Sequence, residues 1–143
     1  MQHIRVIALT LLVAVLTSAC SNSPTTRKDA RPCDGIDRGL TNARKLALAP
    51  ALAKQLQVSD VDVLQSFTAL GWSIIYVDTH QSDPGFLFFS GDPLSSHYVT
   101  LWGGAATKDE EQNIRNWALK NVPGIPQDLA SCFAWHVTRD RDR

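Results

Sequence analysis

WSIIYVDT, residues Trp72–Thr79, is the most strand-like stretch of the chain because it combines aromatic and β-branched residues. Both of its faces carry apolar side chains, which is typical of a central strand. Two further apolar stretches follow, Phe86–Phe89 (FLFF) and His97–Trp102 (HYVTLW), and residues that favour turns separate them, at Ser82–Gly85 and Gly91–Pro93. We therefore predict a three-stranded meander.

Helical patterns flank this meander on both sides. Apolar residues recur at helical spacing between Asp37 and Gln57, where Pro50 predicts two short helices or one kinked helix. Residues 59–71 begin with a capping serine and acidic residues and end with a glycine, which predicts a further helix. Residues 107–110 have the pattern of a capping box and introduce another helix.

A last strand is predicted over Phe133–Thr138 (FAWHVT), because aromatic and β-branched residues predominate there. The predicted order of elements is ααβββαβ. This order indicates a small single domain of the α+β class, with an antiparallel-rich four-stranded sheet and helices packed on one face.

Residues 1–19 have the three parts of a secretory signal peptide. Met1–Arg5 carries a basic side chain, Val6–Leu16 is almost wholly apolar, and Thr17–Ala19 is a run of small residues. The apolar part has about eleven residues, whereas a membrane-spanning helix needs roughly twenty. We therefore expect a leader that is removed.

Cys20, directly after these small residues, resembles the lipobox of bacterial lipoproteins, in which signal peptidase II cuts before a lipid-modified cysteine. The resemblance implies that an acylated Cys20 anchors the mature chain in the membrane. Ser21, in place of the Asp that favours inner-membrane retention, implies the inner leaflet of the outer membrane, facing the periplasm. The alternative is ordinary cleavage after Ala19, which leaves Cys20 as a free thiol.

Residues 20–32 are expected to form a flexible tether, because Ser, Thr, Pro and charged residues predominate and no apolar period occurs. Residues 33–143 then form the folded domain. Lipidation of Cys20 leaves Cys33 and Cys132 to pair as a disulfide in an oxidising compartment. The alternatives are two buried thiols that never meet, or a zinc site, which the spacing of the cysteines disfavours.

The chain contains 14 basic and 14 acidic residues, so its formal net charge at pH 7 is zero. No basic stripe of the kind that binds nucleic acid is visible, and a nucleic-acid partner is not expected. We expect no metal ion and no cofactor, and contact with a membrane only through the lipid.

Candidates for chemistry lie in the predicted turns. Asp78, His80 and Asp83 fall at the end of the meander where Gly103 and Gly104 also lie, close to the start of the helix that follows. Asp78 and His80 are weak catalytic candidates, because no G-x-S-x-G, H-E-x-x-H or glycine-rich phosphate motif accompanies them.

The remaining polar candidates lie elsewhere. Asp92 and His97 belong to the turn at the opposite end of the meander, so His80 and His97 cannot share a metal ion or a proton relay. His136 falls in the middle of the predicted last strand, where we expect a half-buried sheet residue. A partner surface is predicted on a sheet face that helices leave uncovered, with Phe86, Phe88, Trp102 and Trp135 as its candidates.

A small disulfide-linked domain on a lipid tether resembles, as a class, the immunity and inhibitor lipoproteins of the bacterial periplasm. The resemblance implies a binding protein, not an enzyme, that neutralises an antibacterial toxin or a cell-wall hydrolase. One alternative is a structural or assembly lipoprotein of the cell envelope or of a secretion apparatus. The other is a small periplasmic hydrolase that uses Asp78 and His80.

Overall fold

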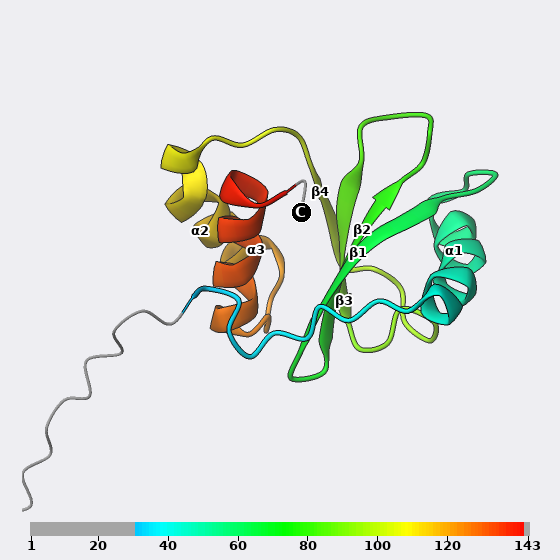
Figure 1. Cartoon of the computed structure of the whole chain (residues 1–143), viewed down its shortest axis with the longest axis horizontal. Coiled ribbons are helices and arrows are strands. Elements are labelled where there is room, and N and C mark those ends of the chain that lie inside the picture. The colour runs from blue at the N-terminus through cyan, green and yellow to red at the C-terminus, as the bar shows by residue number, and fades with distance from the viewer. Residues whose placement is uncertain (1–30, 142–143) are drawn as a thin grey trace, which may run out of the picture.

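The computed structural model describes residues 31–141, which form one α+β domain (Figure 1). The signal peptide predicted at 1–19, the lipid site Cys20 and most of the tether lie outside the described residues. In chain order the elements are α1 (Asn42–Leu56), β1 (Asp62–Ala69), β2 (Trp72–Asp78), β3 (Gly85–Ser90), β4 (Thr100–Gly103), the short 3-10 helix η1 (Lys108–Glu110), α2 (Glu111–Asn121) and α3 (Gln127–Arg139).

The four strands form one antiparallel sheet in the order β1-β2-β3-β4. The predicted meander is confirmed as β2, β3 and β4, and β2 is an interior strand as its two apolar faces indicate. The predicted α+β class and four-stranded antiparallel sheet are also confirmed. The order of elements differs, because two segments adopt the opposite type of secondary structure.

Residues 59–71 supply strand β1 and a hairpin turn, where a helix was predicted. A β-bulge shifts the register with β2 between Val63 and Gln65, so these two residues face opposite sides of the sheet. Val63 and Phe67 are four positions apart in the sequence, which mimics a helical period, but they are buried on opposite faces of the sheet. The turn itself is Leu70-Gly71, and both residues have the positive φ that a two-residue hairpin favours.

The predicted last strand, Phe133–Thr138, lies instead within helix α3. Aromatic and β-branched residues favour strands only weakly, and tertiary packing overrides that preference. The helical period becomes visible once the preceding turn is included, because Leu129, Phe133 and Val137 are all buried at intervals of four residues.

Helices cover both faces of the sheet, which corrects the prediction of a single covered face (Figure 1). Alternation along β2 divides the core: Ile74 and Tyr76 face α2 and α3, whereas Ile75 and Val77 face α1. The larger half of the core holds Phe67, Phe86, Phe88, Ile114, Leu129 and Phe133, and the smaller half holds Leu48, Leu52, Val61, Val63, Leu87 and Phe89.

Side chains cap the starts of two helices, and one of these caps was predicted from the sequence. The hydroxyl of Thr41 accepts a hydrogen bond from the backbone N–H of Arg44 at 3.1 Å and begins α1, which continues through Pro50 as one helix. The capping box before α2 is confirmed, since Glu110 accepts a hydrogen bond from the backbone N–H of Thr107 at 2.8 Å. This bond lowers the pKa of the Glu110 carboxyl group.

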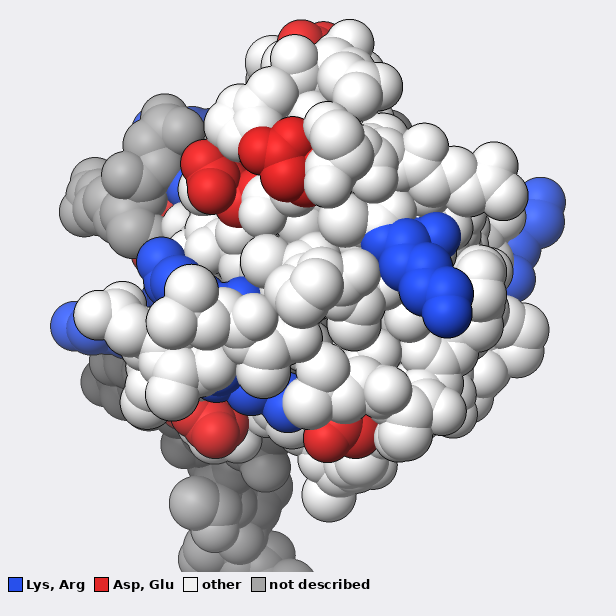
Figure 2. Space-filling view, turned by 90° about the vertical axis from the view of Figure 1, so that its right-hand side faces the viewer, with Lys and Arg blue, Asp and Glu red and all other residues white. Residues whose placement is uncertain are grey.

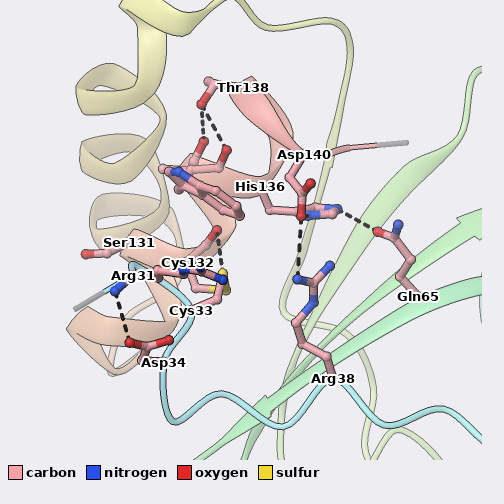
Figure 3. Close-up of a disulfide and its surroundings, with 12 residues drawn as sticks. Arg31, Cys33, Asp34, Arg38, Gln65, Ser131, Cys132, His136, Thr138 and Asp140 are labelled. Atoms are coloured by element: carbon pink, nitrogen blue, oxygen red, sulfur yellow. Dashed lines mark hydrogen bonds and ion pairs between the residues drawn. A yellow bond between two sulfur atoms is a disulfide. The ribbon is translucent and has the colours of Figure 1, made fainter. Parts of the chain in front are cut away.

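The disulfide between Cys33 and Cys132 is present, with a sulfur–sulfur distance of 2.06 Å (Figure 3). It joins the beginning of the described chain to α3, so Cys132 lies in a helix and not at the head of a strand. Across the sheet from this bridge lies α1 (Figure 1).

Candidate functional site

His80 lies between two carboxylates at one end of the sheet. Its Nε2 atom is 3.3 Å from Asp62 Oδ2, and its Nδ1 atom is 3.8 Å from Asp78 Oδ1. The strands explain this arrangement, because Asp62 at the start of β1 pairs in register with Asp78 at the end of β2. Asp62 was not among the predicted site residues, since its segment was expected to be a helix.

The His80 cluster, formed by His80, Asp62 and Asp78, lies at the surface, with the His80 side chain 49 % exposed and the Asp62 side chain 68 % exposed. His80 has a left-handed backbone with φ 58°, and its N–H donates to Asp78 Oδ1 at 2.8 Å, which closes a tight turn. Across residues 31–141 no hydrogen bond or ion pair links the third candidate, Asp83, to His80. The same described residues contain no group of three His, Cys, Asp or Glu side chains that could hold a metal ion.

The turn at the other end of β3 has a structural role against α1. Asp92 accepts a hydrogen bond from Arg44 at 2.6 Å and from the backbone N–H of Leu94 at 2.9 Å, and these bonds hold the pKa of Asp92 below its ordinary value. Gln55 of α1 further donates to the backbone of this turn, and His97 lies within it with Nδ1 3.0 Å from the carbonyl oxygen of Tyr98. His80 and His97 therefore lie in the two turns that flank β3.

The prediction that Phe86 and Phe88 belong to a partner surface is wrong. Phe86 and Phe88 are fully buried, with ring centroids 5.3 Å and 4.9 Å from that of Phe133 in α3. A side chain enclosed by α3 cannot contact a partner. Trp102 packs against the same Phe133 ring and is half-buried, and Trp135 is half-buried on α3 beside the disulfide.

His136 is completely buried and belongs to the larger half of the core, where a half-buried strand residue was predicted. Its Nε2 atom lies 2.6 Å from Gln65 Oε1, while the Gln65 amide donates to the carbonyl oxygen of Arg141 at 3.1 Å. Figure 3 shows this polar group beside the disulfide, together with the Arg38–Asp140 ion pair. These contacts connect the N-terminal segment, β1 and the end of α3.

An apolar groove lies between the first half of α1 and the start of β1, and we call it the α1–β1 groove. It encloses about 550 Å³ and is lined by Asn42, Lys45, Leu46, Ala49, Val61, Asp62, Val63 and Leu64. Leu46 is 77 % exposed and Leu64 is 39 % exposed. Burial of Val61 and Val63 gives the groove an apolar floor, and Lys45 and Asp62 add charge at its sides.

The outer side of α1 is also apolar, and Leu46 belongs both to this side and to the groove. Leu48 and Leu52 are fully buried, but Ala43, Leu46, Ala47 and Pro50 are exposed at helical spacing on the outer side. A helix that packs against the protein on a single side is expected to have polar residues on its solvent side. The solvent side of α1 carries these apolar residues instead. Figure 2 looks onto this side of the domain and shows a largely uncharged surface with separate basic and acidic groups.

No protein family, no curated protein sequence and no solved structure matches this chain. Within residues 31–141, no helix is both long and apolar enough to cross a membrane. The α1–β1 groove and the His80 cluster are adjacent, because Asp62 belongs to both.

Proposed function

We propose that this chain is a lipid-anchored periplasmic binding protein whose α1–β1 groove receives a protein partner. In this proposal the partner is an antibacterial toxin or a cell-wall hydrolase, and the chain acts as its immunity or inhibitor protein. The observation that carries the proposal is the exposure of Leu46, 77 %, beside Leu64 above an apolar floor.

The groove has the composition of a protein contact site. Complete burial of a leucine side chain contributes about 1.5–3 kcal/mol. A few such anchors near the centre of an interface supply most of the binding energy, while polar groups around them determine orientation. In the proposed interface Leu46 and Leu64 are the anchors, and Lys45 and Asp62 are the charged residues that orient the partner.

The position of the groove agrees with attachment through Cys20. The described chain begins beside α3, to which Cys33 is bound, whereas α1 lies on the other face of the sheet (Figure 1). A tether that enters on the α3 side leaves the α1 side accessible to a partner in the periplasm. The disulfide holds the point of entry against the domain.

The experiment is capture of envelope and secreted proteins by the full chain, followed by an activity assay of each captured protein. We expect one toxin or hydrolase that is inhibited at a stoichiometric ratio. Leu46→Asp should abolish capture and inhibition, because it places a charge in the interface. The matched control is Leu70→Asp, since Leu70 is 87 % exposed in the β1–β2 turn.

Two results would contradict the proposal. A partner that both leucine variants retain would show that the groove is not the contact site. A partner that belongs to an assembly or secretion apparatus, and whose activity is not inhibited, would favour the structural alternative over immunity.

A further inference from the structure

The two edges of the sheet differ in how they are protected. The β1 edge carries the bulge at residues 63–65, and the segment before α1 covers its far end through two hydrogen bonds between Asp37 and Thr68, at 3.0 Å and 2.8 Å. An exposed carboxylate, Asp62, lies at its start. Bulges, charges and covering segments are the devices by which natural edge strands avoid pairing with other chains.

The β4 edge is short, with four residues, but within the described residues it has no bulge, no covering segment and no charged residue of its own. The β3–β4 register runs without a shift, and no proline interrupts β4. The stretch from Pro93 to Thr107 contains no Asp, Glu, Lys or Arg. In the part of the chain that the structure describes, the backbone of β4 forms hydrogen bonds only with β3, so its outer edge is open.

Apolar side chains accompany this open edge. Leu101 in β4 is 45 % exposed, and Val99, directly before β4, is 46 % exposed. Leu101 pairs in register with the fully buried Leu87, so it extends the α1 side of the core outward to the edge of the sheet. A strand added beside β4 would cover this leucine.

The geometry points to a second copy of this chain as the occupant: two β4 strands pair antiparallel about a two-fold axis and join the two sheets. An uncharged strand is matched by its own copy, and the chain without residues 1–19 has a formal net charge close to zero, so it has little long-range repulsion from itself. Such a contact uses the same surface on both copies and leaves only the protected β1 edges outside. Assembly therefore stops at the dimer.

The dimer is reversible, because β4 has only four residues and short edge strands offer few hydrogen bonds. Sedimentation equilibrium of the full chain in density-matched detergent, over a dilution series, tests it. We expect a monomer–dimer equilibrium. Leu101→Lys should weaken association at least about tenfold, because it sets like charges beside one another across the two-fold axis. Leu70→Lys, in the distant β1–β2 turn, should leave the equilibrium unchanged.

Two lipid-anchored molecules in one detergent micelle would have the mass of a dimer. Because this co-occupancy of a micelle does not depend on residue 101, Leu101→Lys distinguishes it from a β4–β4 dimer. A wild-type chain that is monomeric at all concentrations overturns the inference, as does a dimer that Leu101→Lys leaves intact. Hydrogen exchange on the wild-type chain gives a second measurement. The amides of residues 100–103 should exchange more slowly at high protein concentration, and exchange that is independent of concentration contradicts a β4–β4 contact.

Discussion

His136 Nε2 lies 2.6 Å from Gln65 Oε1, and this buried contact joins α3 to β1. The Gln65 amide donates to the carbonyl oxygen of Arg141, so its carbonyl oxygen is the acceptor and His136 Nε2 carries the proton. One glutamine thus connects two elements that are far apart in the chain.

Gln65→Ala is expected to lower the free energy of unfolding by about 1–3 kcal/mol, because it removes the partner of a buried imidazole N–H. Urea denaturation followed by circular dichroism measures the change. Gln81→Ala, in the exposed turn after β2, is the control and should change stability by less than about 0.5 kcal/mol. Equal effects of the two substitutions would contradict a structural role for this contact.

Replacement of both Cys33 and Cys132 by serine is expected to cost about 2–5 kcal/mol of unfolding free energy. The bridge joins two residues with a sequence separation of 99, so its loss increases the conformational entropy of a large part of the unfolded chain. Urea denaturation of the two proteins measures the difference. Mass spectrometry without reductant should show the Cys33–Cys132 linkage in the wild-type chain, and two free thiols would refute it.

Leu46 and Leu48 lie on opposite sides of the same helix and provide a matched pair. Leu48→Ala should cost about 2–5 kcal/mol, because Leu48 is fully buried. Leu46→Ala should change stability by less than about 0.5 kcal/mol. The same Leu46→Ala protein should bind the proposed partner more weakly, so denaturation and binding measurements together separate folding from recognition.

Arg44→Gln is expected to raise the pKa of Asp92 toward its ordinary value of 3.8, measured by NMR titration of the carboxyl group. The rise should be partial, because the backbone N–H of Leu94 still bonds the carboxylate. A carboxyl group whose pKa is lowered in the folded state stabilises the protein at any pH above its ordinary pKa. This stabilisation is lost as the pH falls through the lowered pKa of the folded state.

The stability difference between the wild-type chain and Arg44→Gln should therefore be complete at neutral pH and vanish in strong acid. Its size should be below about 1 kcal/mol, because both side chains are partly exposed. Lys54→Gln removes a charge from the same helix without touching Asp92, and it should leave the pKa of Asp92 unchanged. A difference between the wild-type chain and Arg44→Gln that persists in strong acid would exclude the ion pair as its cause.

Cys20→Ser should move the mature chain from the membrane to the soluble periplasmic fraction, because the proposed anchor is lipid on this cysteine. Mass spectrometry of the N-terminal peptide should show acyl mass in the wild-type chain and none in the variant. Asn22→Ala retains the cysteine and should stay in the membrane fraction. An unmodified Cys20 in the wild-type chain would favour the ordinary secretory leader.

Local patterns were sufficient for most of the elements. β2, β3 and β4 are apolar runs bounded by turn residues, and the Thr107–Glu110 capping box marks the start of a helix by contacts within a single turn. The α1 helix also follows from local spacing, although Pro50 does not divide it. In each case the signal and the structure involve residues close together in the chain.

The sites were less predictable. His80 and Asp78 are in contact as neighbours in sequence, but Asp62 reaches them only through the pairing of β1 with β2. The aromatic run of β3 indicated a surface, yet Phe86 and Phe88 are enclosed because α3 is a helix that packs over them. The α1–β1 groove was not predicted, because one of its walls is the unexpected strand β1.

Sequence alone thus determined the three-stranded meander and the Thr107–Glu110 capping box, since each depends on local chemistry, and it favoured the pairing of Cys33 with Cys132 over two separate thiols. Tertiary structure alone decided that residues 62–69 are a strand and residues 127–139 a helix. The physical reason is that the bulged β1 gains its hydrogen bonds from β2, and the aromatic α3 gains its burial from the sheet. Both gains come from distant residues and outweigh weak local preferences. These two elements determine which side chains stay exposed, and so they determine the groove and the open β4 edge.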